Sequence, residues 1–128
     1  MDEQAAPLYR QIAALIEDSI MDYSLKPGDQ VPSTNELAAF HSINPATARK
    51  GLALLHEANI VEKRRGLGMF VTPLAREIIV QRRQESFAAD YLAPLIDEAV
   101  KLEFSRAHLH ELLDRVAESR GLYHEKDQ

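Results

Sequence analysis

The 128-residue sequence predicts a mainly α-helical fold with one small β-hairpin, and three observations lead to this prediction. Residues 32–52 contain two helix-start signals that are separated by a short turn. A glycine-containing hairpin with basic residues at its base follows and ends at Val71. Beyond Pro73 only helix signals occur. Two short helices and a basic hairpin are the layout of a winged helix-turn-helix, in which the second helix enters the major groove of DNA.

The first predicted helix begins near Pro7, because proline is pre-set for an opening turn, and it ends before the Pro27-Gly28 turn. Its apolar residues recur at helical spacing, at Leu8, Ile12, Leu15, Ile16 and Ile20. The second helix begins after Ser33, which forms a capping box with Glu36 three residues later. We expect its buried side to consist of Leu37, Ala38 and Phe40.

The third predicted helix is the one expected to read DNA. Asn44 is a favoured N-cap and Pro45 suits the first helical position. Ala48, Leu52 and Leu55 recur at helical spacing and should face inward. The outer face of the first turns then carries Pro45, Ala46, Thr47, Arg49 and Lys50.

The hairpin is predicted from two short apolar strands, at residues 60–62 and 69–71, that are joined through Gly66-Leu67-Gly68. Three basic residues, Lys63-Arg64-Arg65, precede the glycines. They could form a charged edge that resists aggregation. Beside a DNA-reading helix, we favour contact with phosphates or with the minor groove.

The tail is predicted to be helical and to dimerise, which divides the chain into a DNA-binding domain at residues 1–73 and a dimerisation segment at residues 74–128. Pro94 should kink or break a long amphipathic helix. Ser105 should mark the start of a final helix, and Gly121 its end. The apolar stripe could pack on the winged helix of the same chain, but its extent favours a dimer interface. The predicted interface residues are Phe87, Tyr91, Leu95, Ala99, Leu102, Leu109, Leu112, Leu113 and Val116.

The net charge of −5 at pH 7 does not by itself indicate a nucleic-acid-binding protein, but the charge is unevenly distributed. Residues 49–65 carry five basic and two acidic side chains, so the positive charge lies where the motif requires it. No segment approaches the ~20 apolar residues that cross a bilayer, and the start at Met1-Asp2-Glu3-Gln4 lacks the pattern of a signal peptide. We therefore expect a cytoplasmic protein that does not associate with membranes; without cysteine it forms no disulfides.

The five histidines raise the question of a metal site. His108 and His110 diverge on a helix, whereas His110 and Asp114 could share a face. A surface set of two such residues is more often a polar face than a metal site. No nucleophile, base and acid can be assembled either, so we predict no metal, no cofactor and no enzymatic activity.

Short motifs follow one another over residues 7–71, namely Pro7-Leu8-Tyr9, Leu25-Lys26-Pro27-Gly28, Pro32-Ser33, Glu36-Leu37-Ala38, Thr47, Arg49 and Gly66-x-Gly68-x-Phe70-Val71. This set resembles the GntR family of bacterial transcription regulators. The Ile43-Asn44-Pro45 turn and the short helical tail resemble the family's YtrA-like branch. Asn35 and Pro45 stand where arginines are frequent in the family, and Gly51 replaces the usual alanine, at a cost of roughly 1 kcal/mol inside a helix. These departures bear on the operator sequence more than on the fold.

The sequence therefore predicts a sequence-specific DNA-binding regulator, and most simply a repressor, that binds an inverted-repeat operator in double-stranded DNA as a homodimer. It leaves room for a small-molecule effector that it does not identify. The predicted DNA-contacting residues are Ser33, Thr34, Asn35, Asn44, Pro45, Ala46, Thr47, Arg49, Lys50, Arg64, Arg65, Gly66 and Gly68. The alternative is a winged-helix protein-interaction module without DNA readout, and the basic helix face and hairpin favour DNA.

Overall fold

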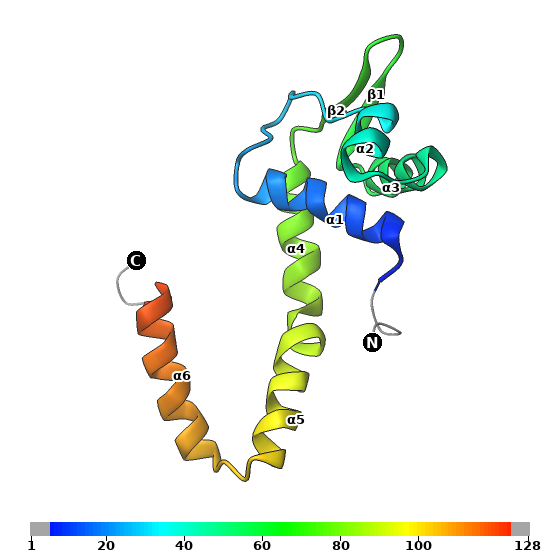
Figure 1. Cartoon of the computed structure of the whole chain (residues 1–128). Coiled ribbons are helices and arrows are strands. Elements are labelled where there is room, and N and C mark those ends of the chain that lie inside the picture. Colours follow the sequence, from blue (N-terminus) through cyan, green and yellow to red (C-terminus); the bar gives the residue numbers. More distant parts are fainter. Residues whose placement is uncertain (1–5, 124–128) are drawn as a thin grey trace. The chain divides into compact units, whose positions relative to one another are not determined.

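The computed structural model describes residues 6–123, which form six α-helices, one π-helical turn and two strands. The helices are α1 (Leu8–Met21), α2 (Thr34–His41), α3 (Pro45–Glu57), α4 (Ala75–Phe87), α5 (Ala93–Lys101) and α6 (Arg106–Arg120). The strands β1 (Val61–Arg64) and β2 (Gly68–Val71) lie between α3 and α4 in the chain, and the π-helical turn η2 (Ala88–Leu92) joins α4 to α5 (Figure 1). The fold is mainly α with a small β-hairpin, as predicted.

The chain divides into two compact units, Met1–Gln84 and Glu85–Gln128. The core of the first unit lies between α1 and α3. From α1 come Ile12, Ala13, Ile16 and Ile20, and from α3 come Ala48, Leu52 and Leu55. None of these side chains is more than 5% exposed, so the inward face predicted for α3 is confirmed. Burying each leucine or isoleucine contributes about 1.5–3 kcal/mol to folding.

Gly51 allows α1 and α3 to approach closely. A Cβ atom at this position would lie 2.9 Å from the backbone oxygen of Tyr9 and 3.3 Å from Cγ2 of Ile12. Real Cβ atoms essentially never come as near as the first of these distances. The glycine that looks unfavourable from helix propensity alone is therefore required by the packing of α3 against α1.

The hairpin, or wing, consists of β1 and β2, which pair antiparallel with Val61 opposite Val71 and Arg64 opposite Gly68. It extends away from α2 and α3 (Figure 1). Gly66 and Gly68 have φ angles of 76° and 121°, in the left-handed region that favours glycine. Gln30 ties the wing to the segment before α2, because its Nε2 donates a hydrogen bond to the Leu67 carbonyl oxygen at 2.7 Å.

Phe40 does not belong to the core, contrary to the expectation from the sequence. Leu37 and Ala38 of α2 are buried, whereas Phe40 is 84% exposed. At helical spacing Phe40 is rotated by about 110° from the middle of the Leu37–Ala38 pair, so it leaves the face that packs on the other helices. Its ring instead contacts the His41 ring edge-on, with 4.9 Å between the ring centres.

The first compact unit extends beyond the wing, into α4. Ala75 and Ile79 are fully buried and belong to the same core as α1 and α3. This compact unit ends at Gln84, and the predicted boundary at residue 73 between DNA binding and dimerisation stays a prediction. The helix that links the wing to the tail is thus partly a structural element of the first unit.

The interruption expected at Pro94 takes the form of the π-helical turn η2, after which Pro94 lies in the first turn of α5. Proline has no backbone N–H, and its ring crowds the carbonyl of Asp90 four residues earlier, so regular α-helical bonding cannot continue. In the second unit, Ser105 caps α6 by accepting a hydrogen bond from the His108 N–H at 3.0 Å. Gly121 ends that helix with a left-handed φ of 88°. Both boundaries agree with the prediction.

Candidate nucleic-acid interface

The predicted DNA-contacting residues come from three segments of the first unit: the start of α2, the start of α3 and the wing. At the start of α2, the Ser33 hydroxyl accepts a hydrogen bond from the Glu36 N–H at 3.1 Å, and the Ser33 N–H donates to the Glu36 carboxylate at 2.8 Å. This is the predicted capping box. Thr34 and Asn35 form the first turn, which is a helix N-terminus of the kind that attracts phosphate.

The start of α3 has the predicted cap as well. The Asn44 side-chain oxygen accepts a hydrogen bond from the Ala46 N–H at 2.7 Å, and Pro45 occupies the first turn. Asn44, Pro45, Ala46 and Arg49 are exposed, whereas Thr47 is half-buried. Among residues 6–123, the Arg49 side chain makes no hydrogen bond or ion pair. Its guanidinium is therefore available to a ligand in front of α3.

Lys50 is held differently from Arg49. Its Nζ atom lies 4.3 Å from the centre of the Tyr9 ring, in a cation–π contact between α3 and α1. Arg10 also reaches Tyr9, because its Nε donates to the Tyr9 hydroxyl at 3.5 Å. That hydrogen bond lowers the pKa of Tyr9 below its ordinary value. The interaction holds the Lys50 ammonium at the edge of α3 that adjoins α1.

Tyr9 and Arg10 were not predicted as parts of this surface. They lie 41 and 40 positions before Lys50 in the sequence, and no local spacing connects them with α3. The only signal was Gly51, whose missing side chain permits the close approach of the two helices.

The wing presents its basic residues in two ways. Arg64 is held within the hairpin, since its Nη2 bonds the Glu62 carboxylate at 3.1 Å and its guanidinium lies 4.2 Å from the Phe70 ring centre. Arg65 is exposed at the turn and has no hydrogen bond or ion pair within the described part of the chain. Gly66 and Gly68 are exposed beside it, with the left-handed backbone that the turn requires.

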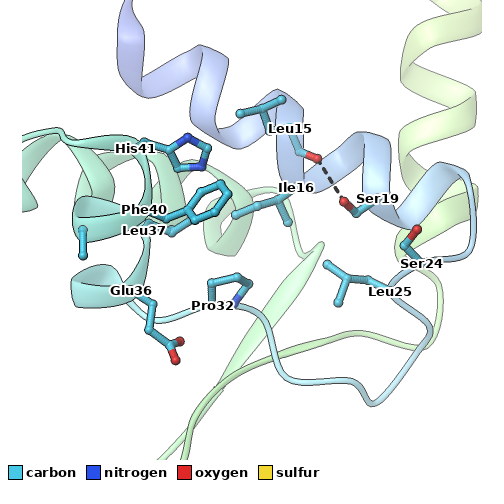
Figure 2. A pocket seen from close by; sticks show the side chains of 11 residues that line it. Leu15, Ile16, Ser19, Ser24, Leu25, Pro32, Glu36, Leu37, Phe40 and His41 are labelled. Carbon is cyan, nitrogen blue, oxygen red and sulfur yellow. Dashed lines mark hydrogen bonds between the residues drawn. The ribbon is translucent and has the colours of Figure 1, made fainter.

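A groove of about 950 Å³ lies beside the interface, between α1 and α2 (Figure 2). Its lining is mostly apolar, and Leu15 and Phe40 border it as exposed side chains. Glu36, whose carboxylate closes the cap of α2, is also part of the lining. One wall of the groove is therefore formed by α2, whose first turn carries predicted DNA contacts.

The residues considered for a metal site do not gather into one. Within residues 6–123, no group of three or more histidine, aspartate or glutamate side chains could hold a metal ion. His108 instead contacts the Phe104 ring, with 4.9 Å between the ring centres. In the same part of the chain, no helix is both long and apolar enough to cross a membrane. Met1-Asp2-Glu3-Gln4 lies outside the described residues.

The residues predicted for dimerisation present a largely exposed apolar surface on the second unit. Tyr91 is 67% exposed and Phe87 50%, and their rings lie 5.5 Å apart. Leu95, Leu102, Leu113 and Val116 are also exposed, and Leu109 and Leu112 are half-buried. Ala99 is different, because it is only 7% exposed and is covered within its own chain.

Three exposed large apolar residues of η2 and α5 were missed, namely Leu92, Ile96 and Val100. Each lies three or four positions from another apolar residue of the same stretch, so the helical periodicity contained the signal. They widen the apolar surface of η2 and α5 beyond the stripe predicted for it.

Comparison with known proteins places this fold and interface in a family. Residues 8–71 match the family described as bacterial regulatory proteins, gntR family. The chain is 28% identical over 113 residues to the HTH-type transcriptional repressor YtrA of Bacillus subtilis, which covers 88% of this chain and 86% of YtrA. The structure of a GntR family transcriptional regulator from Listeria monocytogenes matches with a TM-score of 0.68 and 26% identity, over 88% of this chain and 97% of the other.

A second similar structure contains DNA. The DNA-binding domain of AraR in complex with operator ORX1 matches with a TM-score of 0.53 and 26% identity, over 56% of this chain and 87% of the other. A winged helix-turn-helix with such relatives defines a DNA-binding transcriptional regulator. The chain belongs to the GntR family.

Proposed function

We propose that this chain is a homodimeric transcriptional repressor that binds an inverted-repeat operator. The observation that carries the proposal is the exposed start of α3, where Arg49 has no partner among the described residues and Asn44 and Pro45 fix the first turn. An exposed, unpaired arginine on the second helix of a helix-turn-helix suits a bidentate contact to guanine. The repressor role is supported by the name of the relative YtrA, and the cytoplasm is where such a regulator would act.

The other predicted contacts divide into base reading and phosphate binding. Thr47 at the front of α3 suits a phosphate or a thymine methyl group. Lys50 and Arg64 are held by aromatic rings and suit phosphates, which require a cation at a fixed place rather than a pattern of hydrogen bonds. The first turn of α2, with Ser33 using its hydroxyl in the cap, would offer backbone N–H groups to a phosphate.

The dimer is proposed to form through the second unit. Its exposed apolar side chains on α5 and α6 would leave water when two copies associate, which is the main driving force of such interfaces. Two copies related by a two-fold axis present two recognition helices in opposite directions, so the operator should be an inverted repeat.

The decisive experiment is selection of bound duplexes from a random library, followed by affinity measurements over a range of salt concentrations. We expect one inverted-repeat sequence to be enriched. Its affinity should fall steeply with salt, because each phosphate contact contributes about −0.9 to the slope of log K against log salt. A winged-helix module that binds proteins would enrich no sequence, and that result would refute the proposal.

A further inference from the structure

Glu17 is the one charged residue that is buried within residues 6–123, being 7% exposed. It lies on α1, and two arginines of α4 reach its carboxylate. Arg82 bonds Oε1 of Glu17, and Arg83 reaches the same oxygen at 3.3 Å. The Arg83 Nη2 also lies 3.0 Å from the Asp18 carboxylate. The four side chains form one ion-pair cluster between α1 and α4.

The charges in this cluster hold one another in place. A buried carboxylate is tolerated only when it is paired and hydrogen-bonded. Burial by itself would lower the pKa of Arg83, but the hydrogen bonds to Asp18 and Glu17 outweigh it and raise that pKa above its ordinary value. The hydrogen bonds to Asp18 and Glu17 therefore favour the charged form of Arg83.

The cluster is the last of three attachments of α4 to the rest of the first unit. In the first turn, Ala75 is fully buried and Arg76 donates from Nε to the Met21 carbonyl oxygen at 3.1 Å. Ile79 is fully buried one turn later. Arg82 and Arg83 follow after a further turn, immediately before the end of the first unit at Gln84. Apolar packing holds the first two turns, whereas the third depends on Glu17.

We propose that Glu17 is a positioning residue that sets the half-site spacing which the dimer accepts, by fixing the direction in which α4 leaves the DNA-reading unit. The inference rests on the proposed homodimer. α4 runs from Ala75, in the core of the first unit, to Phe87, beyond Gln84 where that unit ends, so loss of the ion pairs at residues 82–83 would free the last turn of α4. In the proposed dimer, holding this turn in both copies would restrict the separation of the two recognition helices.

The spacing of the half-sites is a sensitive readout of this role. Each added base pair moves a half-site by about 3.4 Å and turns it by about 34°, since one helical turn holds 10–10.5 base pairs. The test uses the full chain with the selected operator, with variants of it that are shortened or lengthened by one or two central base pairs, and with a single half-site. The parent should bind the altered operators on the order of 10²-fold more weakly, because both heads can no longer engage together.

Glu17→Gln keeps the shape of the side chain and removes the charge that attracts both arginines. We expect unchanged binding to the single half-site, about tenfold weaker binding to the best operator, and less than about threefold discrimination between spacings. Asp18→Asn should have a smaller effect, because among residues 6–123 the exposed Asp18 carboxylate forms an ion pair with Arg83 and not with Arg82. Glu77→Gln is the matched control on the exposed side of α4 and should behave as the parent does.

Hydrogen exchange of the amides of residues 80–84 provides a second measurement that does not depend on DNA. It should accelerate in Glu17→Gln while the amides of α3 stay protected. If Glu17→Gln loses half-site binding as severely as operator binding, Glu17 supports the fold of the head and the positioning role is wrong. Retained spacing discrimination in a folded Glu17→Gln would overturn it as well. A monomeric parent would refute the dimer, and with it this role, whereas a dimeric parent that is indifferent to spacing would refute this role alone.

Discussion

Replacing Gly51 by alanine sets two opposite effects against each other on α3. Alanine is favoured over glycine inside a helix by about 1 kcal/mol. The added Cβ, however, would lie 2.9 Å from the Tyr9 backbone oxygen and 3.3 Å from Ile12 Cγ2. The first of these atoms belongs to the backbone of α1, so it cannot be avoided by a rotamer change. The two helices must separate.

The cost of packing the added Cβ should exceed the gain in helix propensity. Inserting one carbon into a well-packed core costs about 1–3 kcal/mol. Subtracting the propensity gain leaves a net loss of about 1 kcal/mol in the free energy of unfolding. For a unit of this size, that loss would lower Tm by about 4–8 °C.

Thermal and urea unfolding of the parent and of Gly51→Ala measure this difference directly. Ala53→Gly is the matched control, since Ala53 is exposed on the same helix and reports the propensity effect alone. It should destabilise the protein by about 1 kcal/mol. A Gly51→Ala protein that is more stable than the parent would show that α1 and α3 yield without cost, and would refute the packing argument.

Three further predictions concern function. Arg49→Ala should weaken operator binding by about 1–3 kcal/mol without unfolding the protein, whereas Lys50→Ala should lower the affinity for specific and random duplexes nearly equally. Titrations of each variant with both kinds of DNA distinguish these outcomes. An Arg49→Ala protein with unchanged operator affinity would remove Arg49 from the interface. Gly68→Val should impair DNA binding more than Gly66→Ala, because a β-branched residue is strained at the φ of 121° and its Cβ would displace the Gln30 amide that bonds the Leu67 carbonyl oxygen. A Gly68→Val protein that binds DNA as the parent does would make the wing dispensable. Leu95→Asp should yield monomers in sedimentation because it places a carboxylate in the proposed apolar interface. Leu122→Asp lies outside the predicted interface and should leave the protein dimeric. A dimeric Leu95→Asp protein would place the interface elsewhere.

The caps and the turns of the first unit could be predicted from the sequence because their signals are local. Ser33 and Glu36 are three residues apart, and Asn44 precedes Pro45 directly, so one helical turn determines both caps. Gly68 could be predicted from its place in the hairpin, where the backbone requires a left-handed φ. Phe40 was wrongly assigned to the core, because the local signal is weak there. In a helix as short as α2, an apolar residue at the edge of the buried face cannot be assigned from spacing alone.

The contacts between α1 and the later helices could not be predicted, because their partners are far apart in the chain. Glu17 and Arg82 are 65 positions apart, and Tyr9 and Lys50 are 41. In the sequence, Arg82 and Arg83 look like two neighbouring solvated arginines on a polar helix. Only the packing of Ala75 and Ile79 into the core brings them to α1. The same packing explains why the compact unit ends at Gln84, and why a fragment ending at residue 72 would lose part of its core.

The cations at the predicted interface differ in how much freedom they retain, and this difference bears on how the protein would read DNA. Lys50 rests on the Tyr9 ring and Arg64 on the Phe70 ring, so each is restrained by an aromatic contact before DNA arrives. Immobilising a free side chain on binding costs about 0.5–1.5 kcal/mol, and these two residues avoid much of that cost. Arg49 and Arg65 have no such restraint among the described residues and can adjust to a particular base edge. We infer that the held cations contribute affinity for any duplex, whereas the mobile ones, Arg49 above all, contribute the preference for one sequence.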